Sequence, residues 1–252
     1  MKNVAIIQAR MSSSRLPGKV LKEAGGRLLL DRMVERVKWA KRVDEVVVAT
    51  TIDPSDDEIE QFCRLHQFAC FRGNLLDVLD RYYQAAQQYQ ADAIIRLTGD
   101  CPLIDSELID ATILAREKAD ADFSCNRLPP PFPRTYPIGL DVETCSFAAL
   151  ESAWKNAGAK NEREHVMPYL YEEEGRFKVV KIDHDPDYGS LRWTVDTPED
   201  LEFVRAVYAA FENRNDFTWL DVLHLVQQHP ELSAINAGIH HKSMFDVDAR
   251  NK

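Results

Sequence analysis

Four short apolar runs, three of them rich in β-branched residues, alternate with longer segments in which apolar positions recur every three or four residues. The runs are typical of strands that are buried on both faces, and they lie at residues 4–7, 45–50, 69–71 and 93–97. The longer segments indicate helices at residues 28–41, 55–66 and 75–89. Because strands and helices alternate, the pattern predicts a mostly parallel sheet with right-handed crossovers.

This pattern breaks at the proline cluster of residues 128–133, which cannot continue a helix or a central strand and therefore predicts a loop. Beyond it we expect strands at 139–143, 178–182 and 191–195, and helices at 148–156, 162–173, 198–213 and 219–229. Ser55 with Glu58, and Thr197 with the Pro-Glu-Asp that follows it, are typical helix starts. We predict one domain over residues 1–233, followed by a polar, weakly patterned tail at 234–252.

Charge and cysteine content narrow the class of protein. A net charge of −10 argues against nucleic acid or an anionic membrane as the partner, because such partners select a basic face. No stretch approaches the roughly 20 apolar residues of a membrane span, and the chain starts without a signal-peptide pattern. The five cysteines are widely spaced and form no Cys-x-x-Cys pair, so we expect reduced thiols in a cytoplasmic protein.

The opening segment is a basic island on this acidic chain. Residues 1–27 hold six basic side chains and one acid, and residues 8–19 read QARMSSSRLPGK directly after the first predicted strand. The carboxyl end of such a strand is where open α/β sheets bind ligands. Arg10, Arg15 and Lys19 could converge on a triphosphate, with donors from the three serines that follow Met11. The alternative is a solvated basic loop with a turn at Pro17-Gly18, and the segment lacks the glycine and hydroxyl positions of a P-loop.

Two aspartates stand at the ends of other predicted strands. Asp100 lies in a Gly-Asp-Cys-Pro turn after the fourth strand, and Asp196 follows the late run at 191–195. Each alone could be an ordinary turn or cap residue. Together with the basic loop they compose a nucleotide–Mg²⁺ site, because Mg²⁺ typically takes one or two carboxylates and completes its shell with water and phosphate oxygens.

The segments 8–19, 99–104 and 195–200 resemble the cytidylyltransferase family that activates sugar acids such as Kdo and sialic acid. Further segments are more similar to the branch named for spore coat polysaccharide biosynthesis protein F, and they lie at 71–73, 77–83, 139–143 and 163–169. The resemblance covers most of residues 3–210. It implies an α/β protein with a three-layer, Rossmann-like nucleotide-diphospho-sugar transferase fold, binding of CTP, Mg²⁺ on Asp100 and Asp196, and a homodimer.

The same resemblance implies transfer of CMP from CTP to a sugar or sugar-acid acceptor, with release of pyrophosphate, in surface polysaccharide biosynthesis. The residues expected to carry catalysis are Arg10, Lys19, Asp100 and Asp196. Those expected to bind the nucleotide are Gln8, Ala9, Arg10, Ser12, Ser13, Ser14, Arg15, Lys19, Arg72, Thr98 and Asp100. Residues 127–190 are expected to form an acceptor-side and dimerisation subregion, and the acceptor is expected to contact Asp141, Glu143, Arg163, His165 and Arg192.

Three points stay open from the sequence. Cys101 stands where the Kdo-activating branch carries a Glu, so the acceptor is not identified. Asp80 and Arg81 are expected to form only an ion pair on a helix surface. A glycosyltransferase that uses a nucleotide sugar on the same fold, and a non-catalytic nucleotide-binding module, are the alternatives to a nucleotidyltransferase.

Overall fold

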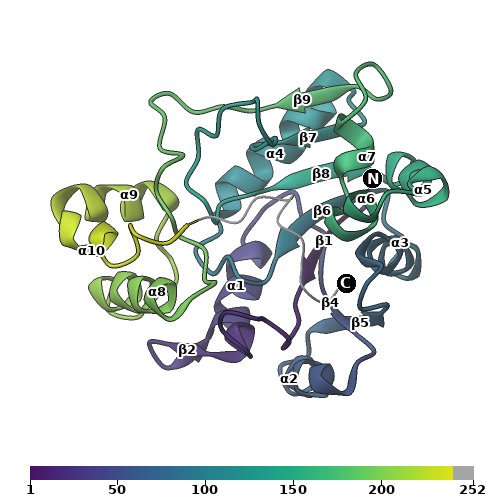
Figure 1. The fold of residues 1–252 in the computed structure, drawn as a ribbon. Coiled ribbons are helices and arrows are strands. Elements are labelled where there is room, and N and C mark those ends of the chain that lie inside the picture. Colours follow the sequence, from purple (N-terminus) through teal and green to yellow (C-terminus); the bar gives the residue numbers. More distant parts are fainter. Residues whose placement is uncertain (241–252) are drawn as a thin grey trace.

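A seven-stranded sheet forms the centre of the protein, seen in a computed structural model that describes residues 1–240 (Figure 1). The strand order is β5-β4-β1-β6-β8-β7-β9. Strands β1 (Asn3–Gln8), β4 (Glu45–Thr51), β5 (Ala69–Gly73) and β6 (Ala93–Thr98) are parallel, as predicted. Strand β8 (Glu143–Ser146) runs antiparallel to both β6 and β7 (Phe123–Cys125), and β9 (Val179–Lys181) runs parallel to β7.

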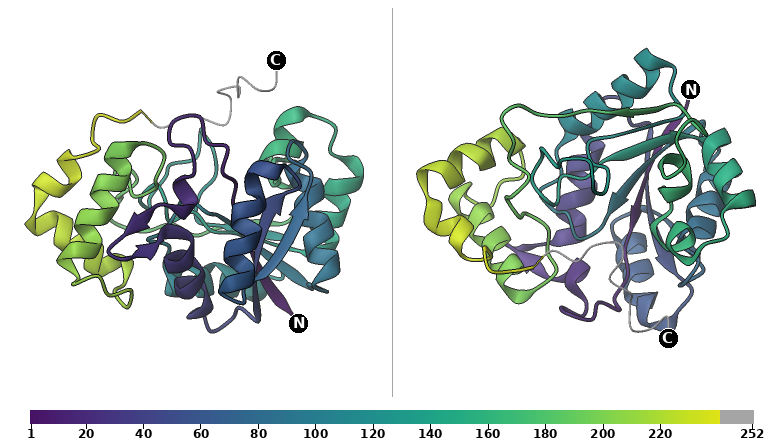
Figure 2. Two further views of the ribbon diagram at one scale, coloured as in Figure 1. Left: turned by 90° about the horizontal axis from the view of Figure 1, so that it is seen from below. Right: turned by 45° about the horizontal axis from the view of Figure 1, so that its top comes forward.

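Helices cover both faces of the sheet, so the fold has the three layers that the family resemblance implies (Figure 2). Along β1, Ala5 and Ile7 face one core, and Val4 and Ile6 face the other. The first core is shared with α1 (Leu29–Lys38), α2 (Asp57–Leu65), α4 (Ser106–Ala119), α8 (Pro198–Ala210) and α9 (Trp219–Gln228). The second core is shared with α3 (Val78–Gln88), α5 (Phe147–Asn156) and α7 (Pro168–Tyr171).

Smaller elements complete the described chain. A two-stranded sheet joins β2 (Glu23–Ala24) to β3 (Arg27–Leu28), and 3-10 turns lie at Lys19–Leu21 and Pro54–Asp56. Helix α6 (Lys160–His165) precedes α7, and α10 (Pro230–Ala234) follows α9. Of the tail predicted at 234–252, residues 241–252 lie outside the described residues. The proline cluster is a loop, as expected, and no helix within residues 1–240 is long and apolar enough to cross a membrane.

One of the two predicted helix starts is wrong and the other is confirmed. Asp53, rather than Ser55, supplies the cap, because its carboxylate accepts from the Ser55 amide at 2.9 Å and opens a 3-10 turn ahead of α2. At α8 the Thr197 hydroxyl accepts from the Asp200 amide at 3.3 Å, and the Asp200 carboxylate accepts from the Thr197 amide at 3.0 Å. This reciprocal pair is a capping box.

Three predicted elements in the second half are also corrected. Residues 139–142 form a turn rather than a strand, since Gly139 has φ of 107° and packs against the 193–194 backbone. The run at 191–195 makes only one isolated bridge, because the Val195 amide donates to the Asp100 carbonyl instead of to a strand. The helix predicted at 162–173 breaks into α6 and α7 at Val166, whose φ is 72°.

Candidate functional site

Lys19 lies between two aspartates that come from distant parts of the chain. Its Nζ donates to Asp100 Oδ2 at 2.7 Å and to Asp196 Oδ1 at 2.8 Å. Lys19 ends the loop that follows β1, Asp100 follows the adjacent parallel strand β6, and Asp196 precedes α8. The structure therefore brings together the three charged segments that the sequence singled out, at the carboxyl edge of the sheet.

The opening loop is held by its own backbone and by a carboxylate from outside it. The Met11 carbonyl accepts from the amides of Ser13 at 2.8 Å and Gly18 at 2.9 Å. Gly18 has φ of 68°, which glycine adopts without the cost that a side chain would add. The Met11 amide in turn donates to Asp56 Oδ1 at 2.7 Å. Asp56 is buried and also accepts from the Thr51 amide at 3.2 Å, so the end of β4 fixes the position of the loop.

The two aspartate turns are tied to each other. The Asp100 carbonyl accepts from the Val195 amide at 2.8 Å and from the Thr194 hydroxyl at 3.2 Å. Asp200 Oδ2 accepts from the Asp196 amide at 2.9 Å, so the first turn of α8 orients the aspartate that Lys19 contacts. These bonds explain why the 191–195 segment crosses the site as an extended chain outside the sheet.

Three cations surround Asp196. Besides Lys19, it pairs with Arg15 Nη2 and with Arg192 Nη2, each at 2.9 Å. Arg192 Nε also donates to the fully buried Asp200 at 2.8 Å. In the cluster formed by Arg15, Lys19, Asp100, Arg192, Asp196 and Asp200, hereafter the Lys19 cluster, three positive charges match three negative ones.

The pKa values follow from these contacts. Burial by itself would lower the pKa of the Lys19 ammonium, but the charges of Asp100 and Asp196 outweigh burial and raise it. Burial would raise the pKa of Asp196, but Lys19, Arg15 and Arg192 hold it well below its ordinary value. Lys19 and Asp196 are therefore charged at neutral pH.

Asp100 and Asp196 form a donor set that fits Mg²⁺. Their oxygens converge on one cation, the Lys19 ammonium, and carboxylate oxygens are the ligands that Mg²⁺ prefers. Within residues 1–240, no group of three or more His, Cys, Asp or Glu side chains gathers at one point. A divalent ion held here would take its other ligands from water and from the substrate, which is the usual arrangement for Mg²⁺.

The other residues expected to bind the nucleotide fall into two groups. Gln8, Ala9, Arg10 and the three serines lie at the end of β1 and in the opening loop, and the Thr98 hydroxyl contacts Cys101 Sγ at 3.2 Å beside Asp100. Arg72 lies elsewhere. Its guanidinium donates to the Thr51 carbonyl at 2.8 Å and pairs with Asp57 and Glu60 of α2 at 2.7 and 2.8 Å.

Of the residues expected at the acceptor, only Arg192 joins the Lys19 cluster. Asp141 pairs with Arg134 beside Cys101, close to the cluster, and Glu143 pairs with Arg96 on the neighbouring strand. His165 ends α6.

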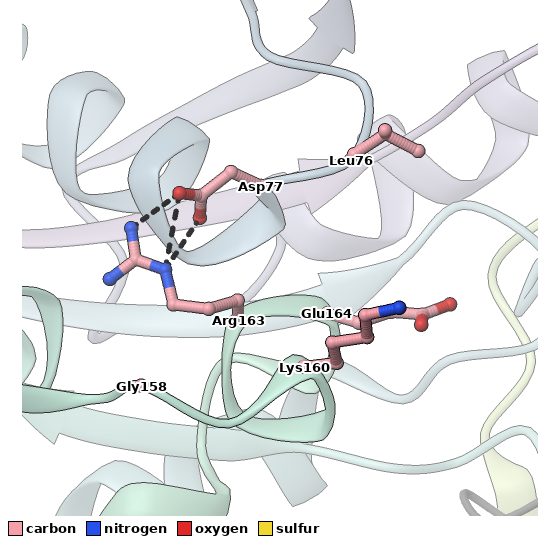
Figure 3. Close-up of a pocket in the computed structure, with 6 residues that line it drawn as sticks. All are labelled: Leu76, Asp77, Gly158, Lys160, Arg163 and Glu164. Atoms are coloured by element: carbon pink, nitrogen blue, oxygen red, sulfur yellow. Dashed lines mark hydrogen bonds and ion pairs between the residues drawn. The ribbon is translucent and has the colours of Figure 1, made fainter. Parts of the chain in front are cut away.

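Arg163 of α6 lies in a separate pocket. Its Nε donates to Asp77 Oδ1 at 3.0 Å across a cavity of about 250 Å³ between α3 and α6 (Figure 3). Lys160 and Glu164 line the same cavity and point away from this ion pair.

Sequence reasoning missed two residues of this region. Asp56 anchors the opening loop and Asp200 orients Asp196, but in the sequence each is only an acid near the start of a helix. The ion pair expected between Asp80 and Arg81 is wrong. Asp80 Oδ1 accepts from Trp154 Nε1 at 2.8 Å, and the Arg81 side chain is buried.

The chain as a whole is similar to several known proteins. A family model described as cytidylyltransferase matches residues 4–220. An uncharacterized protein of Methanocaldococcus jannaschii is 37% identical, covering 98% of this chain and 100% of the relative. Spore coat polysaccharide biosynthesis protein SpsF of Bacillus subtilis is 33% identical, covering 90% and 94%. The solved structure of a cytidylyltransferase from Leptospira borgpetersenii is 35% identical, with a TM-score of 0.87 over 96% of this chain and 100% of that one.

Proposed function

Because this chain belongs to the cytidylyltransferase family, we propose that it transfers CMP from CTP to a sugar or sugar-acid acceptor in surface polysaccharide biosynthesis. The observation that carries the proposal is the placement of Lys19 between Asp100 and Asp196, at the end of a basic loop sized for a triphosphate. The similarity to a protein of spore coat polysaccharide biosynthesis supports the class of pathway.

In the proposed reaction, an acceptor oxygen attacks the α-phosphorus of CTP in line with the bond to the β-phosphate. The new P–O bond forms as that bond breaks, and pyrophosphate leaves with the electron pair. Arg10, Arg15 and Lys19 offset the negative charge that grows on the leaving group. The backbone contacts of Met11 hold these cations in place before substrate binds, so little reorganisation is needed.

Asp100 and Asp196 would hold Mg²⁺, which when bound would neutralise phosphate charge and polarise the α-phosphate. The two carboxylates already converge on a cation, Lys19, so their positions suit a metal ligand set. With the metal bound, Lys19 would be available to the phosphate oxygens. Arg192 and the first turn of α8 keep Asp196 oriented.

For the acceptor side we propose residues 127–190, in which Ile138 forms a bridge with Arg192 of the Lys19 cluster and Asp141 lies close to Cys101. The Arg134–Asp141 pair and Cys101 supply polar groups on that side. Roles for Arg163, which the structure pairs with Asp77, and for His165 at the end of α6 stay predictions. The homodimer and the cytoplasmic location stay predictions, and light scattering on the purified protein tests the first of them.

A screen for pyrophosphate release tests the function. Each of the four NTPs is incubated with Mg²⁺ and with sugar acids, sugar phosphates or neutral sugars, and the product is identified by mass. We expect release with CTP and one acceptor class, and none from an Asp100→Asn variant. A glycosyltransferase would instead consume a nucleotide sugar without releasing pyrophosphate. Absence of pyrophosphate with every pair would contradict the proposal.

A further inference from the structure

Arg81 is a buried arginine whose side chain the fold leaves without a partner. It lies in the first turn of α3, is 2% exposed, and its Cγ would be 2.9 Å from a Cβ added at Gly73. Its Nε and Nη1 are buried without a hydrogen bond, and among residues 1–240 its guanidinium forms no ion pair. Leaving such donors unpaired is costly, so in a native protein each case needs an explanation.

Other arginines of the interior show how this chain satisfies the group. Arg32 donates to the carbonyls of Ala24 and Gly25 at 2.7 and 2.8 Å. Arg36 donates to three backbone carbonyls, at 2.6 to 3.0 Å. Arg96, which is only partly buried, is paired with Glu143 although its Nε has no hydrogen bond. Arg81 differs from these three because no carboxylate or carbonyl within residues 1–240 accepts from its Nε or Nη1.

The surroundings of Arg81 are mainly positive. Burial, with a smaller contribution from the nearby charges of Arg10 and Arg96, lowers the pKa of Arg81 to about 10, against the opposite effects of Tyr82 and Asp56. The guanidinium is still protonated at neutral pH. The Asp56 carboxylate is already used by the Met11 and Thr51 amides, so it orients the opening loop and does not pair with Arg81.

Arg81 also lies on a different side of β1 from the Lys19 cluster. Strand β6, which carries Asp100, flanks β1 on one side, and β4 and β5 flank it on the other. Helix α3 packs against β1, β4 and β5, and Arg81 lies beside the last residue of β5. Whereas the cations of the Lys19 cluster are matched by its acids, Arg81 forms no ion pair with an acid of residues 1–240.

We propose that Arg81 forms an oxyanion subsite, which takes a phosphate or carboxylate group of a bound substrate at the carboxyl edge of β1, β4 and β5. The inference rests on the proposed function for the identity of the substrate, and it adds a binding residue that the candidate site lacked. An oxyanion would satisfy the unpaired donors of Arg81 and would offset its charge. The triphosphate of CTP and an acid group on the acceptor are the two sources.

The matched variants are Arg81→Met and Arg96→Met. Methionine keeps an unbranched apolar stem, so packing under Gly73 is preserved while the charge is removed. If the role of Arg81 is to bind a ligand, Arg81→Met leaves the Tm of the unliganded protein unchanged or raises it, because the substitution removes a buried unpaired charge. Arg96→Met should lower the Tm, because it strands Glu143 without its partner. An Arg81→Lys variant retains the charge without the planar fork.

Calorimetric titration with CTP, CMP and pyrophosphate, all with Mg²⁺, identifies the source of the oxyanion. If it is the triphosphate, Arg81→Met weakens binding of CTP and pyrophosphate by roughly 10- to 100-fold and leaves CMP unchanged. If it is the acceptor, all three titrations are unchanged and the variant loses binding of Kdo or sialic acid, used as carboxylate probes. In either case Arg81→Lys recovers part of the affinity.

The inference is overturned if Arg81→Met lowers the Tm as far as Arg96→Met and binds every probe like the wild type, since Arg81 would then be a packing residue. Failure of the proposed function looks different. A wild-type protein that binds pyrophosphate through Arg81 but no cytidine nucleotide would refute the cytidylyltransferase assignment and leave the subsite standing.

Discussion

Replacing Lys19 by methionine removes the cation between two carboxylates and leaves them facing each other. Asp100 and Asp196 bind Nζ at 2.7 and 2.8 Å, so their oxygens lie no more than about 5.5 Å apart. At that separation their repulsion is about 3 kcal/mol for an effective dielectric constant of about 20. The side chains are 24% and 17% exposed, and Asp196 keeps two arginine partners. We therefore expect the free energy of unfolding to fall by about 2 kcal/mol.

Mg²⁺ should reverse this loss if the two aspartates hold a metal. Without Lys19 the ion loses the one cation that contacts both aspartates, so Mg²⁺ should raise the Tm of Lys19→Met by more than it raises that of the wild type. Turnover with CTP should nevertheless fall by a factor of about 10² to 10³, because a donor to the leaving group is gone. Thermal unfolding with MgCl₂, and with NaCl at matched ionic strength, separates metal binding from charge screening. Pyrophosphate release measures turnover.

Two outcomes would refute this reasoning. Turnover of Lys19→Met close to that of the wild type would remove Lys19 from the reaction. A Tm that responds equally to Mg²⁺ in Lys19→Met and in Lys19→Met/Asp196→Asn would show that the two aspartates do not form the metal site. In that second case the ion pairs of Lys19 would be structural.

Three further predictions concern the supports of the site. Thr197→Ala removes the capping box of α8 and should lower the free energy of unfolding in urea by about 1 kcal/mol, whereas an unchanged midpoint would mean that the cap is redundant. Asp56→Ala should lower kcat/KM for CTP by about tenfold or more, because the Met11 amide loses its acceptor and the opening loop its position. Stability should fall as the pH drops below about 4, because the pKa values of Asp196 and Asp200 are depressed in the folded state and the unfolded chain takes up protons first. Urea unfolding between pH 7 and pH 3 checks this, and a flat profile would contradict it.

The sequence predicts the first half of the fold well because one physical signal dominates there. Strands buried on both faces need continuous β-branched runs, and each of these runs became a parallel strand. The signal is ambiguous for the run at 191–195. Trp193 and Val195 are buried as a strand would be, but the backbone donates to the Asp100 turn. A hydrophobic pattern indicates which side chains are buried. It does not indicate which group the backbone of the segment hydrogen-bonds to.

Part of the candidate site could likewise be predicted from the sequence, and part could not. Lys19, Asp100 and Asp196 could be predicted to meet, because parallel strands and the segments that follow them end at one edge of the sheet. The error at Arg81 has a geometric cause. Adjacent residues on a helix point about 100° apart and do not face each other, so a pair at successive positions is a poor ion-pair prediction. The direction of Arg81, into the protein, depends on how α3 packs, and that is set by the whole second core.

The opening loop concentrates positive charge, and its ion pairs explain how it can be stable in the free protein and still bind a substrate. Arg15 and Lys19 are compensated in the free protein, so their concentration beside β1 costs little until a substrate arrives. Phosphate oxygens must then compete with Asp196 for Arg15 and Lys19. This competition ends only if another cation binds the aspartates in place of Lys19. Binding of the nucleotide and of a divalent ion should consequently be coupled, with Lys19 as the group that passes from one partner to the other. Arg81 needs no such exchange, because it is paired with no acid in the part of the chain that the structure describes.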